Sequence, residues 1–377
     1  MDRTPAESRT VLAQTSVGTL DRIEPVAREW DGLVDRLGGT PFQRPGWIDA
    51  WWRAFGAGPL RVLCAWRAAR LVGVLAVAGH GRHLGSPTNS ESFEFGPVAE
   101  DDAVTQALLE TLLSQGAQRI SISYLDGERT PLETWRRAAA DAGYRLVVRV
   151  RARSPSVAVR GDWPAYEAAL ATSLRSDLRR CRRRLSERGD LTVATCEGGE
   201  GVEGVFGDLL RLEAAGWKGE QGTAIASRPP AERFYRSVAN WAAERGSLRL
   251  FSLRLDGRAV AVLYGLQERG ICYAMKAGYD PQERRFSPGK LLLHSVIEHA
   301  FSTGLARVEL LGVDDPYKRQ WSNVYRESLE LEAFGASPVA RLEWLAFARG
   351  RPLARQLGLR RVLRLPGRGS RLGASPH

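Results

Sequence analysis

Residues 284–290 have the clearest chemical signature of the chain, an Arg-Arg-Phe-Ser-Pro-Gly-Lys run between a predicted strand and a predicted helix. Ser287 suits the N-cap of that helix, and Gly289 lets a ligand approach the backbone closely. The amides and the dipole of a helix N-terminus attract anions, and Arg285 and Lys290 add positive charge. The pattern predicts a phosphate or pyrophosphate cradle; a capped helix with incidental cations is the alternative.

A second polar segment, residues 312–318, follows the next predicted strand, and Trp321 closes it. Ligands of α/β sheets bind at strand ends. Asp314, Tyr317 and Lys318 place a carboxylate, a phenol and an ammonium there. The ammonium could stabilise the oxyanion of an acyl-transfer intermediate, with Asp314 or Tyr317 as the base. A polar turn into a short amphipathic helix is the alternative.

A third segment lies at the end of a predicted helix, where Glu213 precedes Trp217 and Lys218. The tryptophan and the lysine could line a substrate cleft, because residues 219–222 contain glycines and are flexible. Glu213 could act as a general base if it is partly buried, although an exposed glutamate on a helix is the commoner arrangement.

Lysine is rare in this chain and occurs only in its second half. Of the 54 basic residues four are lysines, namely Lys218, Lys276, Lys290 and Lys318. Where either cation would serve, the chain uses arginine. Each lysine is therefore a candidate for a site that needs a compact ammonium.

The cysteines and histidines do not have the spacing of a metal site. The four cysteines are scattered without a CxxC pair, and His80 and His83 are too few to ligate a metal. Residues 1–15 lack the basic start and the apolar run of a signal peptide. We therefore expect no bound metal, reduced core thiols and a cytoplasmic protein.

The order of the predicted elements is repeated along the chain. In each half, helices precede an antiparallel hairpin or meander, and helix and strand follow; the hairpins lie at residues 60–78 and 248–266. The repeat favours two similar mixed α/β domains, each with a mostly antiparallel sheet flanked by helices. We expect these domains at residues 16–155 and 156–340, with a hinge where Pro155 interrupts a strand-like stretch.

The formal charge of +11 is concentrated in two places. Residues 341–377 hold nine arginines and one acid, and we expect a flexible tail that touches an anionic membrane at the inner face. Residues 174–188 predict a helix with one apolar stripe, the rest being covered by arginines. That helix is either a solvated face or a docking surface for a polyanion such as tRNA, a nucleotide-linked sugar or an anionic lipid.

Four short motifs follow one another in the second half: Gly-Trp-Lys-Gly at 216–219, Gly-Tyr-Asp at 278–280, Ser-Pro-Gly-Lys at 287–290, and Tyr-Lys with a later Trp at 317–321. Together with Thr-Pro-Phe-Gln at 40–43, they resemble the CelD/BcsL family of acetyltransferases. That family is a branch of the GNAT superfamily and is related to FemAB-type transferases. The resemblance covers roughly residues 30–334.

This resemblance implies two GNAT-like domains in tandem. It implies N-acyl transfer from acetyl-CoA or another acyl-CoA to an amine of a cell-surface polysaccharide or envelope precursor. It places the CoA pyrophosphate at residues 285–290, although Pro288 and Lys290 break the usual glycine motif of the superfamily. It gives Lys318 the role of stabilising the tetrahedral intermediate. The implied substrate-binding residues are Trp217, Lys218, Tyr279 and Trp321.

Two other functions are compatible with the same residues. FemAB-type enzymes use aminoacyl-tRNA, so the arginine-rich helix could hold a tRNA acceptor stem. The third hypothesis is a non-catalytic adaptor of a polysaccharide synthase, which the basic tail would contact. Binding of an acyl donor separates the adaptor from the two enzymes.

Overall fold

The structure is a computed structural model, which describes residues 14–80 and 82–350. The first half begins with β1 (Thr15–Leu20), η1 (Glu24–Val26), α1 (Ala27–Leu37), η2 (Pro41–Gln43), α2 (Pro45–Phe55), β2 (Leu60–Arg67) and β3 (Arg70–His80). It continues with β4 (His83–Gly85), β5 (Val98–Ala99), α3 (Asp102–Leu113), β6 (Arg119–Asp126), α4 (Leu132–Asp141) and β7 (Arg145–Ala158).

The second half begins with α5 (Trp163–Ala169), α6 (Thr172–Ser186), β8 (Leu191–Cys196), α7 (Gly201–Ala215), α8 (Trp217–Glu220), η3 (Ile225–Ser227) and α9 (Pro229–Glu244). A meander of β9 (Leu248–Leu255), β10 (Arg258–Glu268) and β11 (Ile271–Tyr279) follows. The described chain ends with η4 (Pro281–Phe286), α10 (Pro288–Ser302), β12 (Arg307–Glu309), α11 (Pro316–Arg319), β13 (Val324–Phe334), α12 (Pro338–Leu345) and η5 (Ala346–Gly350).

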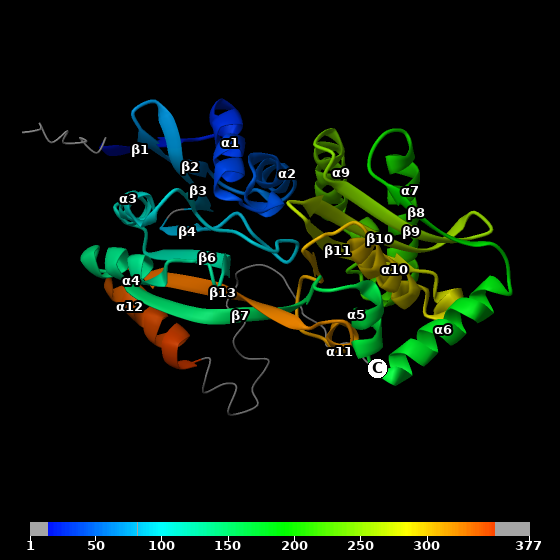
Figure 1. Cartoon of the computed structure of the whole chain (residues 1–377). Coiled ribbons are helices and arrows are strands. Elements are labelled where there is room, and N and C mark those ends of the chain that lie inside the picture. Colours follow the sequence, from blue (N-terminus) through cyan, green and yellow to red (C-terminus); the bar gives the residue numbers. More distant parts are fainter. Residues whose placement is uncertain (1–13, 81, 351–377) are drawn as a thin grey trace, which may run out of the picture.

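All these strands belong to one mixed sheet of 13 strands, with helices packed against it (Figure 1). The strand order is β1-β2-β3-β4-β6-β13-β7-β12-β11-β10-β9-β8, and β5 pairs with β3. Only two pairs are parallel, β4 with β6 and β11 with β12. The predicted fold class, mixed α/β with a mostly antiparallel sheet flanked by helices, is confirmed.

The two halves of the sheet have the same topology. Strands β1 to β4 pair antiparallel in order, β4 pairs parallel with β6, and β6 pairs antiparallel with β13. In the other half, β8 to β11 pair antiparallel, β11 pairs parallel with β12, and β12 pairs antiparallel with β7. The predicted repeat of element order is therefore a repeat of topology. The halves have exchanged their last strands, because β7 of the first half pairs with β12 of the second, and β13 of the second half pairs with β6 of the first.

Strand β7 runs unbroken through the predicted hinge. Pro155 lies opposite Tyr325 of β13, and its carbonyl accepts a hydrogen bond from the Leu310 amide at 3.2 Å. A proline has no N–H to donate to a neighbouring strand. Strand β7 tolerates Pro155 because its pairing with β12 begins only at Ser156. The prediction that Pro155 interrupts the strand is wrong. The expected boundary between residues 155 and 156 falls inside β7, and the division into two domains stays a prediction.

Local predictions are confirmed where a turn or an apolar stripe decides the structure. Gly38 ends α1 with a left-handed φ of 63°, and Asp256 and Gly257 form the turn between β9 and β10. The predicted stripe of α6 is buried, at Leu174, Leu178, Cys181 and Leu185. Within the described residues, no helix has the length and apolarity needed to cross a membrane.

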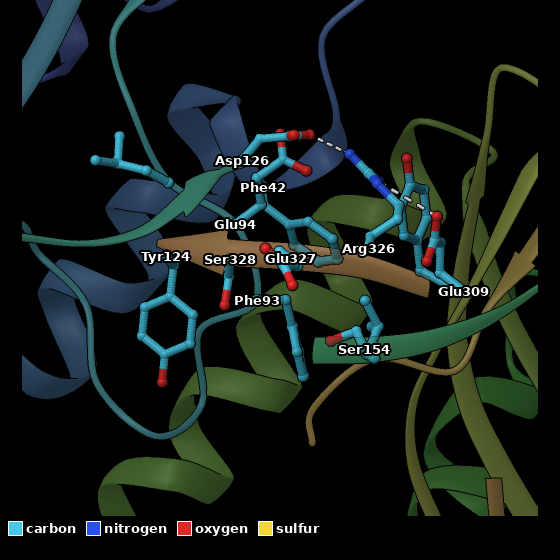
Figure 2. A pocket seen from close by; sticks show the side chains of 13 residues that line it. Phe42, Phe93, Glu94, Tyr124, Asp126, Ser154, Glu309, Arg326, Glu327 and Ser328 are labelled. Carbon is cyan, nitrogen blue, oxygen red and sulfur yellow. Dashed lines mark hydrogen bonds and ion pairs between the residues drawn. The ribbon is translucent and has the colours of Figure 1, made fainter. Parts of the chain in front are cut away.

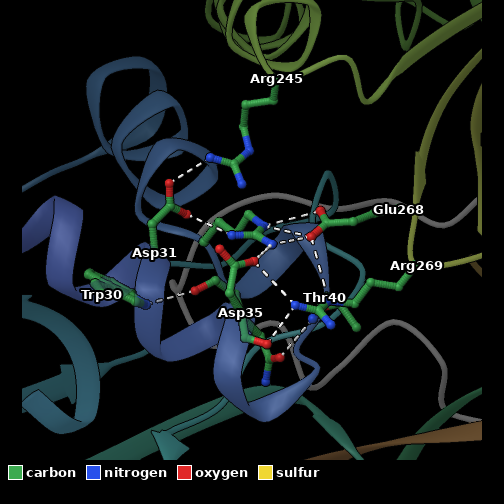
Figure 3. Close-up of polar contacts among 9 residues, drawn as sticks. Trp30, Asp31, Asp35, Thr40, Arg245, Glu268 and Arg269 are labelled. Carbon is green, nitrogen blue, oxygen red and sulfur yellow. Dashed lines mark hydrogen bonds and ion pairs between the residues drawn. The ribbon is translucent and has the colours of Figure 1, made fainter.

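Arg44, whose side chain is only 2% exposed, joins the first half to the second. It donates hydrogen bonds to Asp31 at 2.9 Å and Asp35 at 2.6 Å on α1, and its Nε donates to Glu268 of β10 at 2.8 Å. The same aspartates also pair with two arginines of the second half, Arg245 and Arg269 (Figure 3). Because a buried charge is tolerated only with partners, this network fixes α1 and α2 against β10.

A second ionic network also joins the two halves, across the seam between them, at Glu91 in the loop before β5. The buried carboxylate accepts hydrogen bonds from Arg228 at 2.7 Å and Tyr235 at 2.8 Å, and Lys276 lies 2.8 Å away. Burial opposes ionisation, but Lys276 and Arg228 lower the pKa of Glu91 to about 2. Lys276, one of the four lysines, therefore has a structural partner from the other half.

Arg44→Met should leave three carboxylates close together without their shared counter-charge. We expect the free energy of unfolding to fall by about 3–5 kcal/mol, measured by urea denaturation. Arg53→Met is the matched control, because Arg53 lies nearby on α2 with 67% of its side chain exposed. It should change the free energy by less than about 0.5 kcal/mol. Equal losses in the two variants would contradict a special role for Arg44.

Candidate active site

The predicted anion cradle lies at the N-terminus of α10. Ser287 occupies the N-cap position, but it has a left-handed φ of 49° and its side chain caps no amide. Its carbonyl instead accepts hydrogen bonds from the amides of Lys290 at 2.9 Å and Leu291 at 3.1 Å. In the described part of the chain, the amide of Gly289 has no acceptor. The cradle therefore offers one free amide, beside the exposed Arg285.

The structure brings this cradle together with the second polar segment. The Tyr317 hydroxyl donates to the Gly289 carbonyl at 3.3 Å, and the Lys290 ammonium donates to Gln320 at 3.2 Å. The ring of Tyr279 borders Gly289, since a Cβ added to that glycine would lie 3.6 Å from the ring. Residues predicted from three separate motifs thus form one surface at the ends of β11 and β12.

Tyr317 is better suited to donate a proton than to accept one. The residue is 39% exposed, yet desolvation, together with the negative charge of Asp315, raises the pKa of its phenol. At neutral pH the hydroxyl is therefore protonated. This disfavours the predicted role of Tyr317 as a base and favours that of an acid.

Lys318 holds the turn that precedes it. Its ammonium donates to the carbonyls of Leu311 at 2.7 Å and Val313 at 3.3 Å, and lies 3.6 Å from Asp315. Leu311 and Gly312 both have left-handed φ angles, of 50° and 65°. If Lys318 stabilises an oxyanion, its ammonium does so while it also donates hydrogen bonds to the Leu311 and Val313 carbonyls.

The other two base candidates are both engaged in structural contacts. Asp314 accepts a hydrogen bond from Arg319 at 2.8 Å. Glu213 is 3% exposed, and its carboxylate accepts from the Ile225 amide at 2.8 Å. Glu213 is therefore buried, as the base role requires, but it also anchors η3.

Two of the predicted substrate contacts belong to α8. Trp217 and Lys218 begin this short helix after α7, and their side chains lie outside the described part of the structure. Their predicted role stays a prediction.

Tyr279 is 41% exposed beside the cradle. It sits between two residues with structural roles. A Cβ on Gly278 would lie 2.6 Å from the Glu213 amide nitrogen, and Asp280 caps η4 through the Gln282 amide at 3.0 Å. The Gly-Tyr-Asp motif thus presents a tyrosine at a point where α7 packs closely on β11.

The prediction of a substrate contact for Trp321 is wrong. This residue is 1% exposed and belongs to the core between α5 and α10. Its ring lies 6.2 Å from that of His294, and its carbonyl accepts from the Tyr166 hydroxyl at 2.7 Å. The tryptophan stabilises α11 from inside, because its large apolar surface is removed from water.

A pocket that sequence reasoning missed lies on the seam between the halves (Figure 2). Its cavity measures about 40 Å³ and is partly open to solvent. The aromatic residues that line it are Phe42, Phe93, Tyr124 and Tyr273. The polar and charged ones are Glu94, Asp126, Ser154, Glu309, Arg326, Glu327 and Ser328.

The pocket contains a charged cluster with one unsatisfied member. Arg326 of β13 bridges Asp126 of β6 and Glu309 of β12 (Figure 2). Glu94 is only 8% exposed, and its Oε1 forms no hydrogen bond with the described residues. The nearest cation, Arg129, lies 3.8 Å from that oxygen.

Little in the sequence points to this pocket. Its residues are spread over β6, β7, β11, β12, β13 and the loop before β5, and only their pairing in the sheet brings them together. The one local signal is Asp126, which ends a strand before a glycine.

The comparisons with known proteins agree with this geometry. Residues 172–319 match a family model described as an acetyltransferase (GNAT) domain. The matched region includes both the N-terminus of α10 and the residues Tyr317 and Lys318. No curated protein is significantly similar in sequence.

Solved structures share the fold at low sequence identity. The structure of FemX superposes with a TM-score of 0.57 at 12% identity, covering 86% of this chain and 99% of that one. A DUF2156 domain from Agrobacterium fabrum gives 0.53 at 14% identity, with 88% and 97% covered. A conserved protein from Bacteroides thetaiotaomicron gives 0.50 at 10% identity, with 76% and 88% covered. The likeness extends well beyond residues 172–319, over most of the chain.

Glu94 should make stability depend on pH, because its burial raises the pKa of its carboxyl to about 7 from 4.5. The folded chain then holds this proton more tightly than the unfolded chain. The contribution is full below about pH 4.5 and is lost as the pH rises through about 7. Urea unfolding should show that Glu94→Gln gains roughly 3 kcal/mol over the wild type between these limits. Glu330→Gln, on β13 outside the pocket, should show no such gain, and parallel curves for wild type and Glu94→Gln would contradict the raised pKa.

Proposed function

We propose that this chain is an N-acyltransferase. It transfers an acyl group from acetyl-CoA or another acyl-CoA to an amine of a cell-surface polysaccharide or envelope precursor. The observation that carries this proposal is the convergence of the α10 N-terminus with Tyr317 and Lys318 inside the region that matches the GNAT model. The resemblance to CelD/BcsL acetyltransferases supports the choice of acceptor.

The cradle residues fit one phosphate of the donor. The Gly289 amide is free, the dipole of a 15-residue helix points there, and Arg285 and Lys290 supply positive charge. When bound, the acyl-CoA would supply the activated acyl group. The strained Ser287 keeps its carbonyl turned toward the helix amides, so the Gly289 amide is the one left for an anion.

The chemistry then divides between two neighbouring side chains. Lys318 would stabilise the negative charge that develops on the acyl carbonyl oxygen. Tyr317, protonated at neutral pH, would donate a proton to the leaving group. The Tyr317 hydroxyl is held by the Gly289 carbonyl, which links the phosphate cradle directly to the reaction centre.

Lys318→Ala should lower kcat for acyl transfer by about 100-fold or more, the usual effect of removing one oxyanion donor. The KM for acetyl-CoA should change by less than about threefold, since uniform binding is untouched. Lys290→Ala is the control, because it should raise that KM and leave kcat nearly unchanged. Near-normal turnover of Lys318→Ala with native thermal stability would remove Lys318 from the mechanism.

The alternative is an aminoacyl-tRNA-dependent transferase of FemAB type. Two observations favour it, the fold shared with FemX and the arginine face of α6. The exposed arginines of that face are Arg179, Arg180, Arg183, Arg184 and Arg188. Helix α6 packs beside η4, where the Cys181 thiol contacts the Arg285 carbonyl at 3.9 Å. The C-terminal end of the arginine face adjoins the cradle, because Arg188 pairs with Glu283 of η4.

Calorimetric titration of the full chain with acetyl-CoA, and separately with charged tRNA, decides between the donors. For an acyl-CoA enzyme we expect binding of acetyl-CoA that Lys290→Ala weakens, and no specific binding of tRNA. Binding of tRNA that falls steeply with salt and is lost in Arg179→Gln/Arg183→Gln would favour the alternative. Binding of neither donor would favour the non-catalytic adaptor.

A further inference from the structure

The seam pocket has the size and the chemistry of an ammonium site. A cavity of about 40 Å³ has room for a group of the size of a water molecule. An ammonium group fits this space. Aromatic faces and carboxylates, the groups that attract an organic cation, make up most of the lining.

Glu94 is the lining group without a hydrogen-bond donor. Its side chain is nine-tenths buried, and its Oε1 accepts no hydrogen bond from the described residues. A buried polar oxygen in this state destabilises the fold, and native structures rarely leave one unless a ligand or a water completes it. The oxygen therefore points to a donor that the chain itself does not provide.

Arg326, the buried cation of the pocket, is bound to carboxylates other than Glu94. Arg326 is bound between Asp126 and Glu309, and Arg307 also pairs with Glu309 at 3.2 Å. The other groups that face Glu94 are Arg129, at 3.8 Å and 44% exposed, the phenol of Tyr273, and the Thr40 hydroxyl, which lowers the pKa of Glu94. Since Arg326 already balances a pair of carboxylates, an added cation beside Glu94 would be matched in charge.

The pocket shares a turn with the reaction centre. Leu311 lines the pocket, and its carbonyl accepts from the Lys318 ammonium at 2.7 Å. Ser154, which also lines the pocket, donates to the carbonyl of Gly312. An amino group in the pocket would thus lie against the same three-residue turn that Lys318 holds.

We propose that the seam pocket binds the amino group of the acceptor and that Glu94 takes its proton. This inference rests on the proposed acyl transfer and names the site of its amine substrate. The step is R–NH3+ plus the Glu94 carboxylate giving R–NH2 plus the Glu94 carboxylic acid. One N–H bond breaks, one O–H bond forms, and the neutral amine keeps the lone pair that it needs to attack an acyl carbonyl.

The test is calorimetric titration of the full chain with two amines, D-glucosamine for an amino sugar and Nα-acetyl-lysine for an amino-acid side chain. The controls are their N-acylated forms, N-acetylglucosamine and Nα,Nε-diacetyl-lysine, which lack the ammonium. We expect the wild type to bind at least one amine and neither acylated form. Glu94→Gln should weaken that binding by about tenfold or more, as loss of a charged hydrogen bond does. Glu330→Gln, which makes the same charge change outside the pocket, should bind within about twofold of the wild type.

A measurement on the wild type alone guards against a misfolded variant. The ammonium of Nα-acetyl-lysine, like that of lysine with its pKa near 10.4, stays charged between about pH 6 and pH 8. Its affinity should therefore rise over that range only through ionisation of the protein, in step with Glu94. The proposal is overturned if neither amine binds, if the acylated forms bind equally well, or if affinity is flat with pH.

Parallel titration with acetyl-CoA separates this inference from the function on which it rests. If acetyl-CoA binds and the amines do not, the proposed amine site is wrong and the proposed acyl transfer is unaffected. Amine binding that depends on Glu94 supports the pocket whether or not acetyl-CoA binds, and absence of donor binding then counts against the acyl-CoA enzyme alone.

Discussion

The exchange of β7 and β13 is the constraint on which the rest of the molecule depends. These two long strands pair antiparallel with each other from Arg145 opposite Phe334 to Ser156 opposite Val324, and each then pairs with a strand of the opposite half. The halves consequently share backbone hydrogen bonds through the middle of one sheet. A relative motion of the halves would have to break that ladder, so the seam is a rigid place for a site.

Buried ion pairs, together with the strand exchange, fix the two halves against each other. Arg44, Glu91 and Arg326 are each largely buried near the seam and bound by opposite charges, most of them from elements distant in the chain. A buried ion is stable only when its partner is in place, so these networks select one packing of the helices and strands. Glu94 is the exception, because burial raises the pKa of its carboxyl to about 7 although Arg326, Arg129 and the Thr40 hydroxyl act in the opposite direction. A buried carboxyl with a raised pKa is a candidate functional group.

Sequence reasoning succeeds where neighbours in the chain decide the structure. The hairpin at Asp256 and Gly257, the stop at Gly38 and the buried stripe of α6 all follow from local geometry and periodicity. It fails where distant segments decide. The alternation of apolar and polar residues in β13 does not predict which strands it pairs with. Pro155 predicts the end of a strand, but pairing with β13 keeps β7 extended through it. The motifs correctly group Tyr279, Gly289 and Tyr317, but a motif cannot separate a ligand contact from a core residue such as Trp321.

The turn at Leu311 and Gly312 connects the pocket with Lys318. Leu311 is strained by its left-handed φ, and a non-glycine in that conformation persists only when its surroundings hold it. Lys318 holds it from one side, through the carbonyls of Leu311 and Val313, and Ser154 of β7 holds it from the other. The ammonium that would stabilise an oxyanion and the pocket that would hold the amine are therefore positioned by the same few hydrogen bonds. Because Ser154 lies on one exchanged strand and Arg326 on the other, the placement of the proposed amine pocket relative to Lys318 follows from the strand exchange.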